Sequence, residues 1–194
     1  MVLKTGKGIL VVSDGGKGII AAIKTVFAGM HVHQRCRVHK VHNVISYLPE
    51  SIQTDWKKRL VAIWNIDNYD TALSQLEQCA DELRSINPSA ANSLSEGLEQ
   101  TLTLQRIGMN KLFARSLGST NRIENLNRQL ARITRNVTNW CTPDQRLLWA
   151  ALAALPAEQR MNKLHNYKHI HKLENAISDF LRKSKRNRTS LYFN

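Results

Sequence analysis

The sequence is poor in cysteine and in acidic residues, and both shortages exclude classes of protein. Cys36, Cys79 and Cys141 are its three cysteines, an odd number spread widely along the chain. No signal peptide precedes them, so we expect free thiols in a reducing compartment rather than a disulfide framework. No apolar run approaches the roughly 20 residues that a transmembrane helix needs. The sequence therefore predicts a cytoplasmic protein.

The shortage of acids leaves a strongly basic chain. Fifteen Asp and Glu residues stand against 28 Lys and Arg, which gives a net charge of +13 and a pI near 10.1. This balance favours a polyanionic partner, most often nucleic acid, because each neutralised phosphate releases condensed counterions. The alternative is a basic surface that only keeps the protein soluble. Apolar residues make up 42% of 194 residues, enough for one substantial core.

Hydrophobic spacing predicts an α/β start followed by helices. The β-branched run at 9–12 is typical of a strand covered on both faces, and 17–27 has helical spacing. Residues 30–36 are a candidate second strand, and 38–48 a helix that stops before Pro49. The rest is expected to be helical over 51–113, from Asn121, from Pro143 to Pro156 and over 163–181, with a frayed basic segment at 182–188.

Asp14 follows the first predicted strand and precedes two glycines. Ligands bind at the carboxyl ends of strands in α/β sheets, and a carboxylate there can bind Mg²⁺. Asp before Gly is also common turn chemistry, and Asp14 or Ser13 can cap the helix that begins at Lys17. Both interpretations stay open.

The segment QRCRVHKVHN, residues 34–43, contains half of a zinc-site pattern in Cys36 and His39. Neither of the other cysteines has a ligand partner at zinc-site spacing, so we do not expect structural zinc. His39 and His42 are candidates for an active-site donor and a phosphate contact. A buried cysteine on a polar helix is the alternative.

The segment STNRIENLNRQLARITR, residues 119–135, has a regular apolar stripe and a basic face that carries Glu124. One acid on such a face suits a metal ion beside a phosphate backbone. The structural alternatives are a capping box of Asn121 with Glu124 and an ion pair between Glu124 and Arg128.

These segments occur in a characteristic order: DG-x-x-G after an apolar strand, F-x-G, QRC-x-x-H-K-x-x-N, a long helical stretch and STN-x-IE-x-x-N-x-x-L. The series, from Ile9 to Leu155, resembles the catalytic region of Mutator-type bacterial insertion-sequence transposases. The resemblance implies a mostly helical α/β fold. It would comprise a partial RNase H-like βα segment at 1–50, an all-α insertion at 51–117, helices completing the core at 118–181 and a basic tail at 182–194.

The resemblance also implies DDE chemistry, in which carboxylates bind Mg²⁺ or Mn²⁺ and DNA strands are cut and joined. Asp14 matches the family's second aspartate and Glu124 its glutamate, and the two would meet as metal ligands. Cys36 and His39 match its Cys-x-x-His motif, with His39 as a catalytic candidate, and Asn121 belongs to the TN-x-IE block. The predicted DNA-binding residues are Arg35, Lys40, Arg122, Arg128, Arg132 and Arg135.

One departure from the family pattern changes the expected activity. The family's first aspartate lies on a strand earlier than that of Asp14, and residues 1–13 contain no Asp or Glu. The sequence thus predicts the C-terminal portion of a transposase, inactive alone, with an unpaired edge on its first strand. DNA is the expected partner, with a full-length transposase or a homo-oligomer as further candidates. The alternatives are a non-catalytic DNA-binding or regulatory module and a helical RNA-associated protein.

Overall fold

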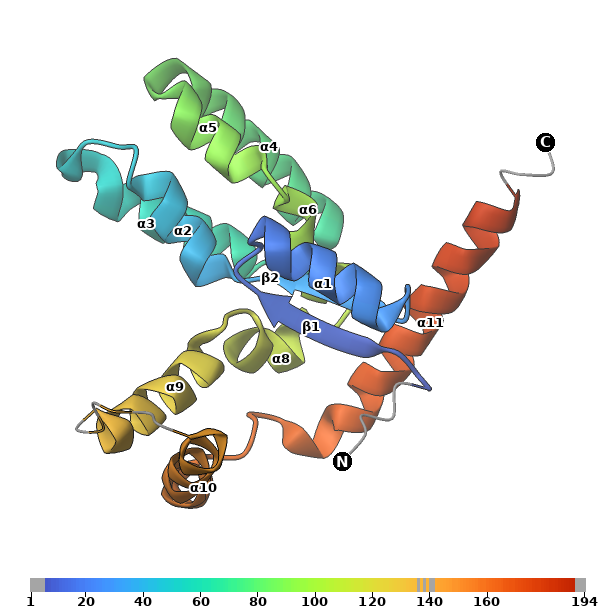
Figure 1. Ribbon diagram of the computed structural model, residues 1–194. Helices are drawn as coiled ribbons and strands as arrows, with labels where there is room; N and C mark the ends of the chain where they lie inside the picture. Colours follow the sequence, from blue (N-terminus) through green and yellow to red (C-terminus); the bar gives the residue numbers. More distant parts are fainter. Residues whose placement is uncertain (1–5, 136, 138, 140–141, 191–194) are drawn as a thin grey trace. The chain divides into compact units, whose positions relative to one another are not determined.

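The protein begins with two parallel strands connected by a helix. The computed structural model describes residues 6–135, 137, 139 and 142–190. In it, β1 (Ile9–Ser13) pairs with β2 (His31–Arg35), and α1 (Lys17–Phe27) connects them (Figure 1). The register pairs Ile9 with His31 and Ser13 with Arg35. The predicted βα unit and its second strand are confirmed.

The two faces of this small sheet are covered by different helices. On one face, Phe27 of α1 contacts the ring of His31, with the ring centroids 6.4 Å apart. On the other face, Val32 belongs to a buried apolar cluster with Leu104, Phe113, Leu173 and Ile177. The four apolar residues of β1 are only half-buried, so the predicted burial of this strand on both faces was wrong.

The chain then continues as helices. Asn68 caps α4 by accepting a hydrogen bond from the amide of Thr71, and Asn87 caps α5 in the same way through Ser89 and Ala90. The prediction of almost continuous helix over 51–113 is confirmed. The helices are α2 (Arg37–Ile45), α3 (Glu50–Trp64), α4 (Tyr69–Ile86), α5 (Pro88–Ser95), α6 (Leu98–Thr101), α7 (Thr103–Arg106) and α8 (Asn110–Leu117).

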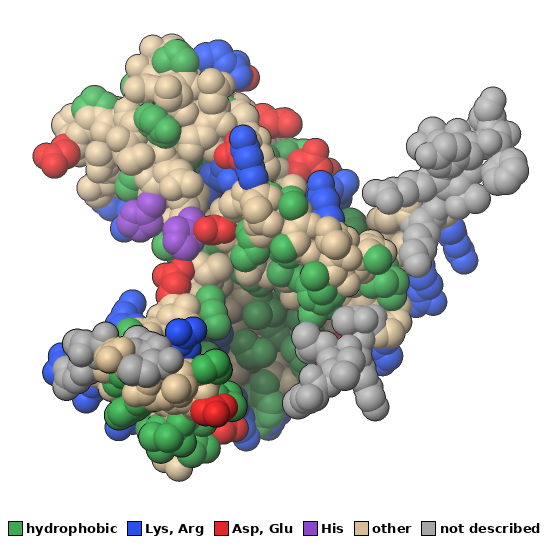
Figure 2. Space-filling view, in the orientation of Figure 1, with side chains coloured by type: hydrophobic (Ala, Val, Ile, Leu, Met, Phe, Trp, Pro, Cys, Tyr) green, Lys and Arg blue, Asp and Glu red, His purple; other side chains and the backbone are tan. Residues whose placement is uncertain are grey.

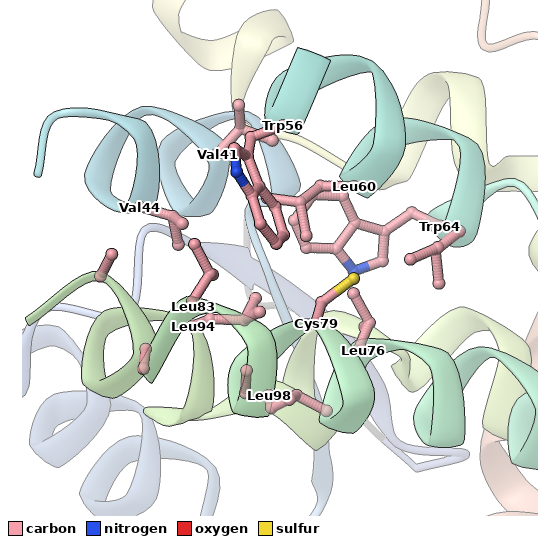
Figure 3. Close-up of a cluster of buried hydrophobic side chains, with 14 of the residues drawn as sticks. Val41, Val44, Trp56, Leu60, Trp64, Leu76, Cys79, Leu83, Leu94 and Leu98 are labelled. Atoms are coloured by element: carbon pink, nitrogen blue, oxygen red, sulfur yellow. The ribbon is translucent and has the colours of Figure 1, made fainter. Parts of the chain in front are cut away.

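The largest core lies among α2, α3, α4 and α5. Figure 3 shows side chains from these helices directed into one interior, among them Val44, Leu60, Leu83 and Leu94. These four side chains are fully buried. Apolar residues at spacings of three and four give each helix a buried stripe, and burial of these stripes holds the helices together.

Three further helices follow in the described residues: α9 (Asn121–Thr134), α10 (Pro143–Arg160) and α11 (Ile170–Ser190), the last preceded by a 3₁₀ turn at Tyr167–His169. Several boundaries differ from the predictions, and the last helix, expected from residue 163, begins at Ile170. Helix α10 continues past Pro156, and α11 includes the basic segment 182–188 that was expected to fray. Residues 191–194 of the predicted tail lie outside the described residues.

The chain forms two compact units. Met1–Ser119 and His165–Asn194 form the first, which contains the sheet and both apolar cores, and Thr120–Leu164 forms the second, in which α9 packs against α10. The mostly helical α/β class is confirmed. The RNase H-like character of the core and the four-part division of the chain stay predictions.

Candidate active site and nucleic-acid contacts

Asp14 lies in the turn that follows β1. Its Oδ1 accepts a hydrogen bond from the amide of Gly16 at 3.0 Å, and Ser13 Oγ accepts one from the amide of Gly15 at 3.3 Å. The residue that precedes α1 is Gly16, and no side chain caps this helix. Asp14 is therefore a turn residue rather than a helix cap. Its carboxylate is exposed, and the structure gives it no second hydrogen bond among the described residues.

The Cys-x-x-His motif begins at the same edge of the sheet. The amide of Cys36 donates to the carbonyl of Ser13 at 2.7 Å, and Arg35 Nε donates to the carbonyl of Asp14 at 3.3 Å. Cys36 is fully buried and directly precedes α2, while His39, one turn into that helix, is half-buried. Figure 2 shows histidine side chains on the surface over α2. The structure thus brings Asp14 and the motif together.

Arg35 and Lys40 are buried, with 5% and 1% of their surface exposed. Arg35 Nη1 donates to the carbonyl of Glu96 and Nη2 to the Glu96 carboxylate at 3.1 Å. Lys40 Nζ donates to the carbonyls of Ser93 and Glu96. Burial, and then the charge of Arg35, lowers the pKa of Lys40 to about 8. Arg35 thus connects the end of β2, and Lys40 connects α2, to the end of α5. Their contact with DNA stays a prediction.

Arg37 was not predicted as a functional residue, yet it lies at the centre of a buried polar network. Its guanidinium donates to the carbonyls of Thr101 and Trp64 and to the side-chain oxygens of Gln105 and Asn110, at 2.6–3.2 Å. Each of these acceptors is uncharged, so the positive charge has no counter-ion among the acceptors that bind it. Burial lowers the pKa of Arg37 to about 10. The signal in the sequence is its position on the apolar face of α2, one and two turns before Val41 and Val44.

A contact between a serine and a histidine was also not predicted from the sequence. Ser13 Oγ and His33 Nε2 are 2.7 Å apart across the two strands. Burial, followed by the charges of Arg35 and His31, lowers the pKa of His33. The register explains the contact, because residues 13 and 33 project from the same face of neighbouring strands. The sequence alone does not give this register.

The second unit carries the remaining candidates. Thr120 precedes α9, and its hydroxyl donates to Glu124 Oε1 at 2.5 Å. Asn121 is the first helical residue, so the predicted capping box of Asn121 with Glu124 was wrong. The predicted ion pair of Glu124 with Arg128 is not among those of the described residues. Glu124 is half-buried, and Asn121 is exposed.

The basic residues of α9 and of its C-cap, Arg135, differ in exposure. Arg122 is half-buried and donates to the carbonyl of Asn162 at 3.2 Å, whereas Arg128, Arg132 and Arg135 are exposed. Asp14 and Glu124 belong to different units, and their meeting at one metal site stays a prediction. Among the described residues, no group of three or more His, Cys, Asp or Glu side chains is placed to hold a metal ion.

Comparison with known proteins decides the family. Residues 5–164 match the family described as "Transposase, Mutator family". The chain belongs to this family. It is 33% identical over 129 residues to the transposase for insertion sequence element ISRM5 of Rhizobium meliloti (strain 1021), an alignment that covers 66% of this chain and 32% of that protein.

This Mutator-family chain is also similar to transposases for insertion sequence element IS256 in transposon Tn4001. It is 29% identical over 127 residues to those of Staphylococcus aureus and of Enterococcus faecalis (strain ATCC 700802 / V583), with 63% of this chain and 31% of each relative aligned. The chain thus spans about a third of the length of these relatives. No solved structure matches it. Each helix in the described part of the chain is too short or too polar to span a bilayer.

Proposed function

We propose that this chain is part of the catalytic region of a DDE-type transposase and acts in DNA transposition, through metal-dependent cleavage and transfer of DNA strands. One observation carries the proposal. In a chain of the Mutator family, an exposed carboxylate follows a parallel strand, and the Cys-x-x-His motif begins at the end of the neighbouring strand. This edge of an α/β sheet is where ligands commonly bind.

Asp14 and Glu124 are the proposed ligands of Mg²⁺ or Mn²⁺. The donor chemistry fits, because both ions prefer carboxylate oxygens and Asp14 uses one oxygen for a single backbone amide. When bound, such ions activate an attacking water or 3′-hydroxyl and stabilise the leaving oxygen. The Gly16 amide fixes the orientation of the Asp14 carboxylate. His39 is the proposed proton donor at the same sheet edge.

The proposed DNA contacts differ between the two units. Arg128 and Arg132 on α9 are exposed, as is Arg135 directly after this helix, and all three suit direct binding of phosphates. Arg35 and Lys40 donate to internal carbonyls, and we assign them an indirect role as positioning residues of the Asp14 turn. We extend the proposal to assembly with a second copy or with a longer transposase, because β1 pairs only with β2 among the described strands.

The binding of Mn²⁺ tests the proposal directly. Water-proton relaxation measures Mn²⁺ affinity for the full chain and for the Asp14→Asn and Glu124→Gln variants. Each variant is expected to bind Mn²⁺ about tenfold more weakly or worse, since each loses a charged oxygen ligand. Asp70→Asn and Glu77→Gln on α4 are matched controls and should bind as the original chain does. Equal affinity in all five proteins would contradict the proposed metal site.

A non-catalytic DNA-binding or regulatory module is the second candidate. The net charge of +13 and the exposed arginines of α9 favour it, because they attract DNA without any carboxylate. The two candidate functions are separated by measuring the DNA affinity of Asp14→Asn and Glu124→Gln at several salt concentrations, together with their Mn²⁺ affinity. Under this candidate, DNA affinity is retained and Mn²⁺ affinity is the same in original and variants. Under the catalytic proposal, Mn²⁺ affinity falls.

A further inference from the structure

A pocket of about 300 Å³ lies in the first unit between α2, α3 and the end of α8. Its apolar walls include Val38 and Val41 from α2 and Val61 and Trp64 from α3. Val38 and Val61 are 37% and 43% exposed, while Val41 and Trp64 are almost fully buried. The two exposed valines therefore give the pocket accessible apolar walls.

Trp64, one of the residues that line this pocket, is rigidly held. Trp64 Nε1 donates to the hydroxyl of Thr101 at 2.9 Å, and the Trp64 carbonyl accepts from Arg37, Gln105 and Asn110. A wall that is already fixed loses little conformational entropy when a ligand packs against it. The pocket is therefore suited to a small, flat, largely apolar group.

The charge around the pocket is of one sign. Lys57 and His42 line it together with Arg37, and no aspartate or glutamate is among the described residues that do so. No ion pair with Lys57 occurs in the described part of the chain, and the acceptors of Arg37 are all neutral. These groups favour an anion, so the occupant combines a flat apolar body with negative charge.

We propose that this pocket receives one unstacked base of the DNA substrate, with Lys57 and His42 contacting the adjoining phosphate. The inference rests on the proposed action on DNA and adds a base-binding position to it. A base presents two apolar faces, which match the valine walls, and polar edges, which match Asn65 and Ser119 at the rim. The volume suits one nucleotide rather than a longer segment.

Variants that fill the pocket provide the test. The full chain is titrated, by fluorescence anisotropy, with a mixed-sequence single-stranded oligonucleotide and with the same strand carrying abasic sites. We expect the original chain to prefer the strand with bases by about fivefold or more. Val61→Phe and Val38→Phe should remove this preference without changing affinity for the abasic strand. Val26→Phe, an equally conservative change on the exposed face of α1, should retain it.

A charge variant tests the phosphate contact. Lys57→Gln should weaken the binding of both strands and reduce the slope of log affinity against log salt by about 1. The neighbouring Lys58→Gln lies outside the pocket and should leave both affinities and the slope unchanged. Photo-crosslinking of a 5-iodouracil strand to the unaltered chain checks the location independently of the folding of any variant. Adducts at the pocket residues support the proposal, and adducts confined to other residues overturn it.

The outcomes separate this inference from the proposed function. If Val61→Phe and Val38→Phe fold and keep the preference for bases, the pocket assignment is wrong while DNA binding stands. If free dAMP binds to the chain but the oligonucleotide does not, the pocket is a mononucleotide site and the inference fails. If the chain binds neither strand at low salt, both proposals fall.

Discussion

The amide of Cys36 donates a 2.7 Å hydrogen bond to the carbonyl of Ser13, and this bond closes the ladder between β1 and β2 at its carboxyl end. The residues that follow the two strands consequently start from one edge of the sheet. Asp14 and the Cys-x-x-His motif, separate in the sequence, are neighbours for this reason. The hydrogen bond thus places the turn that carries Asp14 next to the start of the Cys-x-x-His motif.

The exposed arginines of α9 are expected to bind DNA phosphates directly. Arg128→Ala and Arg132→Ala should each weaken DNA binding similarly for all sequences and reduce the slope of log affinity against log salt by about 1. Filter binding or anisotropy at several salt concentrations measures this. Arg84→Ala, which removes an exposed arginine of α4, is the control. An unchanged slope in both α9 variants would place the DNA contact elsewhere.

Arg37→Met should destabilise the first unit strongly. The substitution keeps an unbranched side chain but removes the donor that Thr101, Trp64, Gln105 and Asn110 share, and leaves buried acceptors unsatisfied. We expect the free energy of unfolding to fall by about 3 kcal/mol or more. Urea denaturation measures this.

The control for that change is Arg84→Met on the surface of α4, which should alter the free energy of unfolding by less than about 0.5 kcal/mol. A loss of under about 1 kcal/mol in Arg37→Met would show that the network around Arg37 contributes little to folding.

Lys40 should make stability depend on pH in the alkaline range. Burial lowers its pKa from 10.5 to about 8, so between these values the folded protein has released a proton that the unfolded chain still binds. The unfolded state then binds more protons, and the free energy of unfolding rises as pH increases from about 8 to about 10.5. Lys40→Met should lack this rise.

The quantity to measure is the difference in the free energy of unfolding between the original chain and Lys40→Met at each pH. It should be constant below about pH 7 and should change in favour of the original chain above pH 8. A difference that stays constant up to pH 10.5 would mean that the Lys40 amine titrates normally in the folded protein.

The outer edge of β1 is expected to promote association. Ile9 donates its amide toward β2, to the carbonyl of Met30, so the amides of Leu10 and Val12 point away from β2. An edge strand with half-buried apolar side chains readily pairs with another chain. Amide exchange at Leu10 and Val12 should therefore be fast at low protein concentration and slow at high concentration. Equally slow exchange in a monomer at every concentration would argue against association through this edge.

The sequence by itself determined much of the local structure and the family. The apolar run before Asp14 specified β1, and spacings of three and four specified the helices, because these patterns follow directly from the periodicities of strand and helix. The order of the DG, QRC-x-x-H and TN-x-IE motifs was enough to indicate the Mutator family, which the match over residues 5–164 confirms. Turn chemistry alone did not reveal that Asp14 bonds Gly16 rather than caps α1.

Only the tertiary structure decided what each basic residue does. Arg35, Arg37 and Lys40 are as hydrophilic in sequence as Arg128, yet they are buried and donate to internal oxygens, while Arg128 is exposed. The difference arises because β2 and α2 pack against helices far along the chain, and carbonyl groups of that region accept hydrogen bonds from these side chains. The net charge follows from composition alone. The hydrogen-bond partners of these buried side chains, in contrast, include residues more than fifty positions away, which only the tertiary structure brings close.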